Sequence, residues 1–196
     1  RSGTLNVPVE VSVRLYVYDG QTMQDQFLYE KDDLDRLADA LSKASARSLE
    51  GWQLPEDPFP LYALRANRTE EDFEAVCVGD VWLDSRGRIL ETDLELGELM
   101  EQMDAPLESS GSLAALPCRR TLALLSGSWD ARFLIPAEAQ GRQEDVTMAL
   151  AYSESGDLSW TVENHTGRSL SHGNGGYASL EVLLESGWYS LPWVPG

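Results

Sequence analysis

The chain opens with hydrophobic positions that alternate with a period of two. In "VEVSVRLYVYDG", residues 9 to 20, five apolar residues share one parity and two tyrosines the other, which is typical of a β-strand. A glycine-centred bend and a second apolar run follow in "DGQTMQDQFLYE", so residues 9 to 30 are predicted to form a β-hairpin. The residues of the first parity are Val9, Val11, Val13, Leu15 and Val17, and those of the second are Tyr16 and Tyr18.

The pattern then changes to a helical period. In "DDLDRLADALSKASAR", residues 32 to 47, Asp32 or Asp33 can cap a helix, and the apolar residues that follow recur at helical spacing. They are Leu34, Leu37, Leu41 and Ala44. We expect this helix to lie across the hairpin.

Strands and a second helix complete the first half. Three prolines in "PEDPFP" exclude a helix or a central strand until Leu61, where "LYALRA" resumes as a strand. "FEAVCVGDVWLDSRGRILE" predicts a strand and a hairpin that turns at residues 84–87. In "TDLELGELMEQMD", Thr92 and Glu95 have capping-box spacing ahead of the helical stripe Leu96, Leu99, Met100 and Met103. Residues 1–110 are therefore expected to form an α+β domain, an antiparallel sheet with two helices.

A small, polar, proline-flanked stretch, residues 105 to 117, is typical of a domain boundary. Beyond it no helix is evident, and six short apolar runs predict strands of a small β-sandwich or barrel over residues 111–196. Leu158, Trp160 and Val162 alternate with polar residues, which favours a core position for the tryptophan. The six runs are "RRTLALL", "ARFLI", "DVTMALAY", "DLSWTVE", "YASLEVLL" and "WYSLP".

Charge and cysteine content argue against several classes of partner and site. The 15 Lys plus Arg against 33 Asp plus Glu give a net charge of -18, which repels nucleic acid and anionic lipid. No apolar run approaches the roughly 20 residues of a membrane span, and the chain starts at Arg1 without a signal peptide. Cys77 and Cys118 lack metal-finger and redox-motif spacing, which leaves a disulfide or two buried thiols.

Ten residues between positions 158 and 192 form one ordered pattern: Glu163, Asn164, Thr166, Gly173, Leu180, Glu181, Gly187, Trp188, Tyr189 and Pro192. With this pattern the segment resembles a bacterial immunoglobulin-like domain found near the C-terminus of predicted Gram-positive surface lipoproteins. The upstream half is similar to the N-terminal regions of such proteins, α+β domains of unknown function. The family's domains continue into further strands ending in Gly-x-Tyr-Arg, a segment that does not occur before Gly196, so the sandwich is either short or completed elsewhere.

Candidate chemistry is sparse. His165 and His172 are seven residues apart without ligands at metal spacing, and the segment around them fits a bend, with Asn164 capping a turn that Thr166 and Gly167 finish. Ser126 and Ser128 near Asp130 lack a nucleophile motif, and the acidic runs "EKDDLD" and "TEEDFE" lack a calcium-loop pattern. Two triplets, starting at Asn67 and Asn164, match glycosylation acceptors, which in a bacterial protein are turn chemistry.

We therefore expect a noncatalytic, extracellular, cell-surface protein with a binding or structural role and no cofactor. Its lipid anchor would lie outside this sequence, and its partner would be a cell-envelope protein or polymer. "WYSLPWVP" holds the binding candidates Trp188, Tyr189 and Trp193, although a last strand packed on the core also explains this segment. The alternative is a hydrolase or metal-dependent enzyme with a site between the domains that uses His165 or His172.

Overall fold

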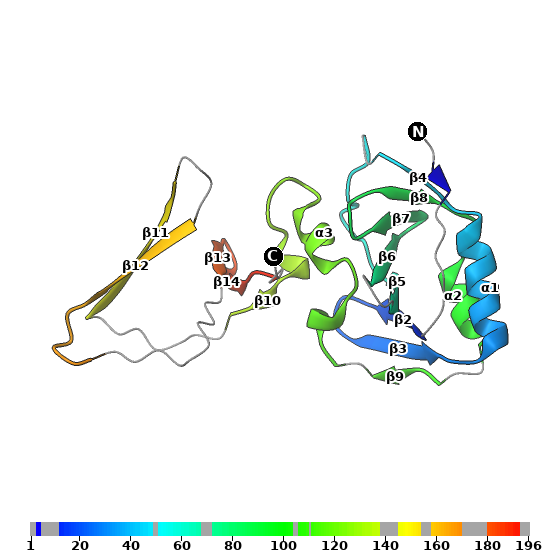
Figure 1. Cartoon of the computed structure of the whole chain (residues 1–196), viewed down its shortest axis with the longest axis horizontal. Coiled ribbons are helices and arrows are strands. Elements are labelled where there is room, and N and C mark those ends of the chain that lie inside the picture. Colours follow the sequence, from blue (N-terminus) through cyan, green and yellow to red (C-terminus); the bar gives the residue numbers. More distant parts are fainter. Residues whose placement is uncertain are drawn as a thin grey trace.

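The computed structural model describes residues 3–4, 12–48, 51–67, 72–103, 106–109, 111–137, 145–153, 158–169 and 180–192 (Figure 1). The helices are α1 (Lys31–Ser42), α2 (Leu96–Glu101) and α3 (Arg119–Leu124), with 3-10 turns η1 (Leu113–Ala115) and η2 (Ala131–Phe133). The strands up to η1 are β1 (Gly3–Thr4), β2 (Ser12–Tyr18), β3 (Met23–Leu28), β4 (Ser45–Arg47), β5 (Leu61–Asn67), β6 (Phe73–Val78), β7 (Val81–Asp84), β8 (Ile89–Glu91) and β9 (Glu108–Ser109). Those after η2 are β10 (Ile135–Pro136), β11 (Val146–Tyr152), β12 (Leu158–Asn164), β13 (Glu181–Leu184) and β14 (Gly187–Ser190).

Antiparallel strands dominate the fold. One sheet has nine strands in the order β1-β4-β8-β7-β6-β5-β2-β3-β9, and every pairing in it is antiparallel. The predicted hairpin is confirmed as β2–β3, and β5 to β8 form the predicted consecutive strands. The turn at residues 84–87 is also confirmed, because the Gly87 amide donates to the Asp84 carbonyl at 3.0 Å.

The first face of the sheet is covered by α1 and α2, which lie side by side on it (Figure 1). Leu37 and Leu41 of α1 and Leu96 and Met100 of α2 are buried there against strand residues such as Leu15. We call this cluster the first core. The two predicted apolar stripes and the placement of the first helix over the hairpin are thus confirmed.

The predicted helix caps are wrong. The N-cap of α1 is Glu30 and that of α2 is Glu95, and neither side chain makes a cap hydrogen bond. Asp32 and Asp33 lie inside the first turn of α1, where the positive end of the helix dipole stabilises their carboxylates. Thr92 Oγ1 accepts instead from the Leu94 amide at 3.2 Å.

The second face of the nine-stranded sheet is covered by the η1–α3–η2 region, which comes after β9 in the sequence. Leu116, Leu122 and Phe133 of the η1–α3–η2 region are buried against Tyr16 and other residues of the parity opposite to the first core. We call this cluster the second core. Residues from both sides of position 110 meet in it, while the division into domains 1–110 and 111–196 stays a prediction.

The strand predictions for "RRTLALL" and "ARFLI" are wrong. The first run forms α3, and the second begins as η2 before the two-residue strand β10. Arg, Leu and Ala are good helix formers, and six residues are too few for an apolar period to separate helix from strand. The other four runs contain β11, β12, β13 and β14.

The C-terminal strands form two small antiparallel sheets, β10-β14-β13 and β11-β12. Val182, Leu184 and Tyr189 of the three-stranded sheet pack against the second core. The β11–β12 hairpin extends away from the rest of the molecule (Figure 1). Trp160 is paired with Leu150 in this hairpin, and the predicted core position of its side chain lies outside what the structure describes.

Candidate functional site

The three binding candidates from the sequence have different positions. Trp188 on β14 is 54% exposed. Its neighbour Tyr189 points the other way, packs against the second core, and places its hydroxyl 2.8 Å from Ser186 Oγ. Trp193 lies outside the described residues. Trp188 is therefore the candidate whose side chain the structure leaves open to contact.

Trp188 has an exposed apolar partner across the β13–β14 hairpin. The register pairs it with Leu183, which is 60% exposed. Because successive strand residues point to opposite faces, the inward positions of the same hairpin pack on the second core. The backbone of β14 is also held along its other edge, because the Ala137 amide donates to the Trp188 carbonyl at 2.9 Å. We call these two side chains the Leu183–Trp188 patch.

A second exposed aromatic group lies at the end of β3. Phe27 and Tyr29 are 42% and 65% exposed, and their rings stack with centroids 6.3 Å apart. The Arg14 guanidinium lies 5.5 Å from the Phe27 centroid and pairs with Asp25 at 2.9 Å. The sequence interpretation missed this group, although Phe27 and Tyr29 share a parity in "QFLYE".

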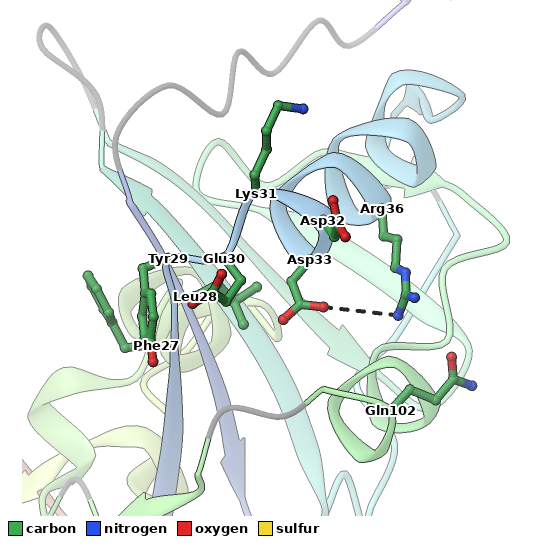
Figure 2. A pocket seen from close by; sticks show the side chains of 9 residues that line it. All are labelled: Phe27, Leu28, Tyr29, Glu30, Lys31, Asp32, Asp33, Arg36 and Gln102. Carbon is green, nitrogen blue, oxygen red and sulfur yellow. Dashed lines mark ion pairs between the residues drawn. The ribbon is translucent and has the colours of Figure 1, made fainter.

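A surface hollow of about 480 Å³ opens beside these aromatics (Figure 2). It is bounded by the end of β3, the start of α1 and Gln102 after α2. Lys31 pairs with Asp35, and Arg36 lies 4.0 Å from Asp33. The described residues that line it include no serine, cysteine or histidine, so they provide neither a nucleophile of these types nor an imidazole base.

A network of ionic hydrogen bonds fastens the η1–α3 segment to the sheet. Glu74 accepts from Arg65 Nε at 2.7 Å and from the Cys118 amide at 2.8 Å. Arg65 also donates to the Ala115 carbonyl and to the Tyr16 hydroxyl, each at 3.3 Å. Burial raises the pKa of Tyr16, although Arg65 and Arg14 act in the opposite direction. Each charged group has a partner, so this network is structural.

The two cysteines are free thiols, so the possible disulfide between Cys77 and Cys118 is not formed. They contact opposite faces of the sheet, Cys77 at the first core and Cys118 in the second. Burial raises the pKa of Cys77 to about 12 and that of Cys118 well above its ordinary value. Because the thiolate is the reactive form, neither is an activated nucleophile.

The bend predicted after β12 is confirmed. Asn164 Oδ1 accepts from the amide and hydroxyl of Thr166 at 3.0 and 2.6 Å, and Gly167 adopts a positive φ of 68°. His165 beside it is exposed, and its Nε2 lies 3.6 Å from Glu163 Oε2. His172 lies outside the described residues, and the alternative of an enzyme site that uses His165 or His172 stays untested.

Other candidate chemistry finds no support in the geometry. Ser126 Oγ bonds to the Ser128 carbonyl, while Asp130 is occupied by Arg132 at 2.7 Å. Within the described ranges, no group of three His, Cys, Asp or Glu residues could hold a metal ion. Across the same ranges no helix has the length and hydropathy to cross a bilayer.

Comparisons with known proteins give no match, whether with protein families, curated proteins or solved structures. The exposed surfaces of the molecule are therefore what indicates its function.

Proposed function

We propose that this chain is a noncatalytic, extracellular cell-surface protein of the lipoprotein type, anchored by a lipid on a segment outside this sequence. Its C-terminal part, residues 111–196, would be an immunoglobulin-like β-sandwich. The two small antiparallel sheets of β10 to β14 support this proposal, as does the resemblance that spans β12 to β14. The expected partner is a polymer or protein of the cell envelope.

The Leu183–Trp188 patch is the observation that carries a binding role. Exposed tryptophan provides a large contact area with few rotatable bonds, and such residues dominate the energetics of many interfaces. The inner face of the same hairpin packs on the second core, which holds the patch in place before any partner arrives. Little conformational entropy is then lost on binding.

Charge indicates which envelope polymer fits. A chain of net charge -18 is repelled by phosphate-rich polymers, whereas a polymer without phosphate presents no such barrier. Peptidoglycan stripped of its phosphate-bearing polymers is therefore the appropriate first probe. A flat apolar patch can pack on the apolar faces of its sugar rings.

The test is cosedimentation of the purified chain with insoluble, phosphate-free peptidoglycan from a Gram-positive bacterium. We expect the wild-type chain to sediment and Trp188→Ala to bind roughly 30-fold more weakly, the effect of losing about 2 kcal/mol at a hot spot. Tyr29→Ala removes a similarly exposed aromatic ring elsewhere and serves as the matched control. Absence of wild-type binding, or equal losses in both variants, would refute this assignment of the patch.

A further inference from the structure

The chain already binds one of its own arginines at the end of β3. Arg14 on β2 lies directly opposite Phe27 in the register of the sheet. Its guanidinium lies 5.5 Å from the centroid of the Phe27 ring, and its Nη1 lies 2.9 Å from Asp25 Oδ2. An aromatic ring and a carboxylate therefore hold this guanidinium together, which is the pair of groups that suits arginine best.

The next residues along the chain offer the same pair of groups without an arginine of their own. The Tyr29 ring stacks on Phe27 with centroids 6.3 Å apart, and Tyr29 remains 65% exposed. Glu30 is also exposed, and although it is the N-cap residue of α1, its side chain makes no cap hydrogen bond. Both residues line the surface hollow of about 480 Å³, a volume in the range of sites that hold small ligands (Figure 2). We call it the Tyr29 hollow.

The carboxylates of the Tyr29 hollow exceed the cations that could neutralise them. Arg36 lies 4.0 Å from Asp33, and Lys31 pairs with a residue outside the lining. No ion pair joins Glu30 or Asp32 to another residue within the described ranges. The positive end of the α1 dipole opposes a bound cation with only about half an elementary charge. Two carboxylates outweigh this, so the hollow favours a cation.

We infer that the Tyr29 hollow is a docking site for an arginine side chain of a protein partner. The guanidinium packs on the exposed Tyr29 ring and donates to the Glu30 carboxylate, as Arg14 does with Phe27 and Asp25. A planar guanidinium can stack and donate at once, whereas a lysine ammonium is a compact and strongly hydrated charge. The hollow is separate from the Leu183–Trp188 patch, and the inference stands whether or not that patch binds.

Other occupants are disfavoured by charge. A free arginine molecule carries a carboxylate that the acids of the hollow repel, whereas in a polypeptide this group is a neutral amide. A phosphate-bearing ligand meets the same repulsion. A second copy of the chain would bring together two molecules of net charge -18.

The test uses three tripeptides with a central arginine, citrulline or lysine between glycines, blocked at both ends. Citrulline has nearly the shape of arginine and no charge. Affinities for the ¹⁵N-labelled full chain are measured from the chemical shifts of its amides. The arginine peptide is expected to bind about fivefold or more tightly than the citrulline peptide and about twofold or more tightly than the lysine peptide. Added salt should reduce its preference over citrulline.

Matched variants locate the ring and the carboxylate. Tyr29→Ala is expected to weaken the arginine peptide about threefold or more, whereas Tyr29→Phe keeps the ring and stays within about twofold of wild type. Trp188→Ala removes an exposed ring elsewhere and is expected to change binding less than about twofold. Glu30→Gln is expected to weaken the arginine peptide about threefold, and Glu181→Gln, the same change at an exposed residue of β13, less than about twofold.

Four outcomes would overturn the inference. The first is absent binding of the arginine peptide, or equal binding of the arginine and citrulline peptides. The second is equal loss in Glu30→Gln and Glu181→Gln, which would indicate general attraction to an acidic chain. The third is equal loss in Tyr29→Phe and Tyr29→Ala, because the ring would then contribute nothing. The fourth is a wild-type dimer in sedimentation velocity that Tyr29→Ala dissociates, which would assign the hollow to a second copy of the chain.

Discussion

The nine-stranded sheet and the β11–β12 hairpin use the same strand geometry in different environments. In β2, Leu15 is buried in the first core and Tyr16 in the second, so successive residues are covered from both sides. In β12, the successive residues Thr161 and Val162 are both exposed. Pairing alone therefore does not bury a strand, because burial requires an element packed against each face.

In each region, the pattern of apolar residues along a strand matches the number of strand faces that other elements cover. Strand β5 contributes Leu61 and Ala63 to the second core and Leu64 and Ala66 to the first, a nearly continuous apolar run. Strand β12 instead alternates apolar residues with Ser159, Thr161 and Glu163. A strand that alternates in this way is built for one covering layer.

Truncation in either core of the sheet is expected to have the largest effect. Leu64→Ala in the first core and Phe133→Ala in the second each remove a side chain that is 0% exposed. Each should lower the free energy of unfolding by about 3–5 kcal/mol, through lost burial and the cavity left behind. Denaturant titration followed by circular dichroism provides the measurement.

The same pair of variants tests whether the two cores unfold together. Leu64 belongs to β5 of the sheet and faces the first core, whereas Phe133 follows position 110 and packs on the opposite face of the same sheet. We expect one transition, shifted by both substitutions. A second transition that responds to Phe133→Ala and not to Leu64→Ala would establish residues after 110 as an independent unit.

Loss of the Glu74 carboxylate should have an intermediate effect. Glu74→Ala leaves Arg65 and the Cys118 amide without their acceptor, and the two charged side chains are only 28% and 23% exposed. We expect a loss of about 1–3 kcal/mol in the free energy of unfolding. Glu74→Gln keeps an acceptor for the amide and should recover part of this loss. Equal effects of the two variants would contradict the role of the Cys118 contact.

Local patterns predicted the elements of the first half well and its caps poorly. The β2–β3 hairpin and the stripes of α1 and α2 follow from periodicity, which reports directly which residues need a core. The cap residues depend on where the backbone leaves the sheet, and tertiary packing decides that. The helix α3 was missed because its six residues give too short a period, and its burial comes from a sheet distant in sequence.

The proposed binding surface was predictable only in part. The sequence names Trp188 as a binding candidate, but its pairing with Leu183 depends on the register of β13 with β14. Phe27 and Tyr29 gave only a two-residue period, which equally fits a buried strand face. Whether a strand residue is exposed depends on which elements pack over the strand, and the sequence of the strand alone does not show this.

The ion pair between Asp130 and Arg132 at η2 gives a smaller, pH-dependent effect on stability. Burial raises the pKa of Asp130, but hydrogen bonds from the Arg132 side chain and amide outweigh it, so the pKa lies below its ordinary value. A lowered folded-state pKa stabilises the protein above the unfolded-state pKa, and this stability disappears as the pH falls through the folded-state value. Asp130→Asn keeps the acceptor for the amide and removes the charge.

The expected difference in the free energy of unfolding between wild type and Asp130→Asn is about 1 kcal/mol near neutral pH. It should shrink toward zero between about pH 5 and pH 2, as Asp130 takes up its proton. Urea titrations of both proteins across this range measure it, and the other carboxylates cancel in the difference. A difference that stays constant with pH would mean that the charge of Asp130 contributes nothing.

Substitutions on the exposed hairpin should have the smallest effect on the stability of the sheet. Val162→Thr and Thr161→Val change opposite faces of β12, and both residues are exposed, so neither removes a contact with the two cores. We expect each to shift the main unfolding transition by less than about 0.5 kcal/mol. A loss above about 1 kcal/mol for Val162→Thr alone would mean that the apolar face of the hairpin is already covered by its own chain. The contrast with the doubly covered sheet would then be wrong.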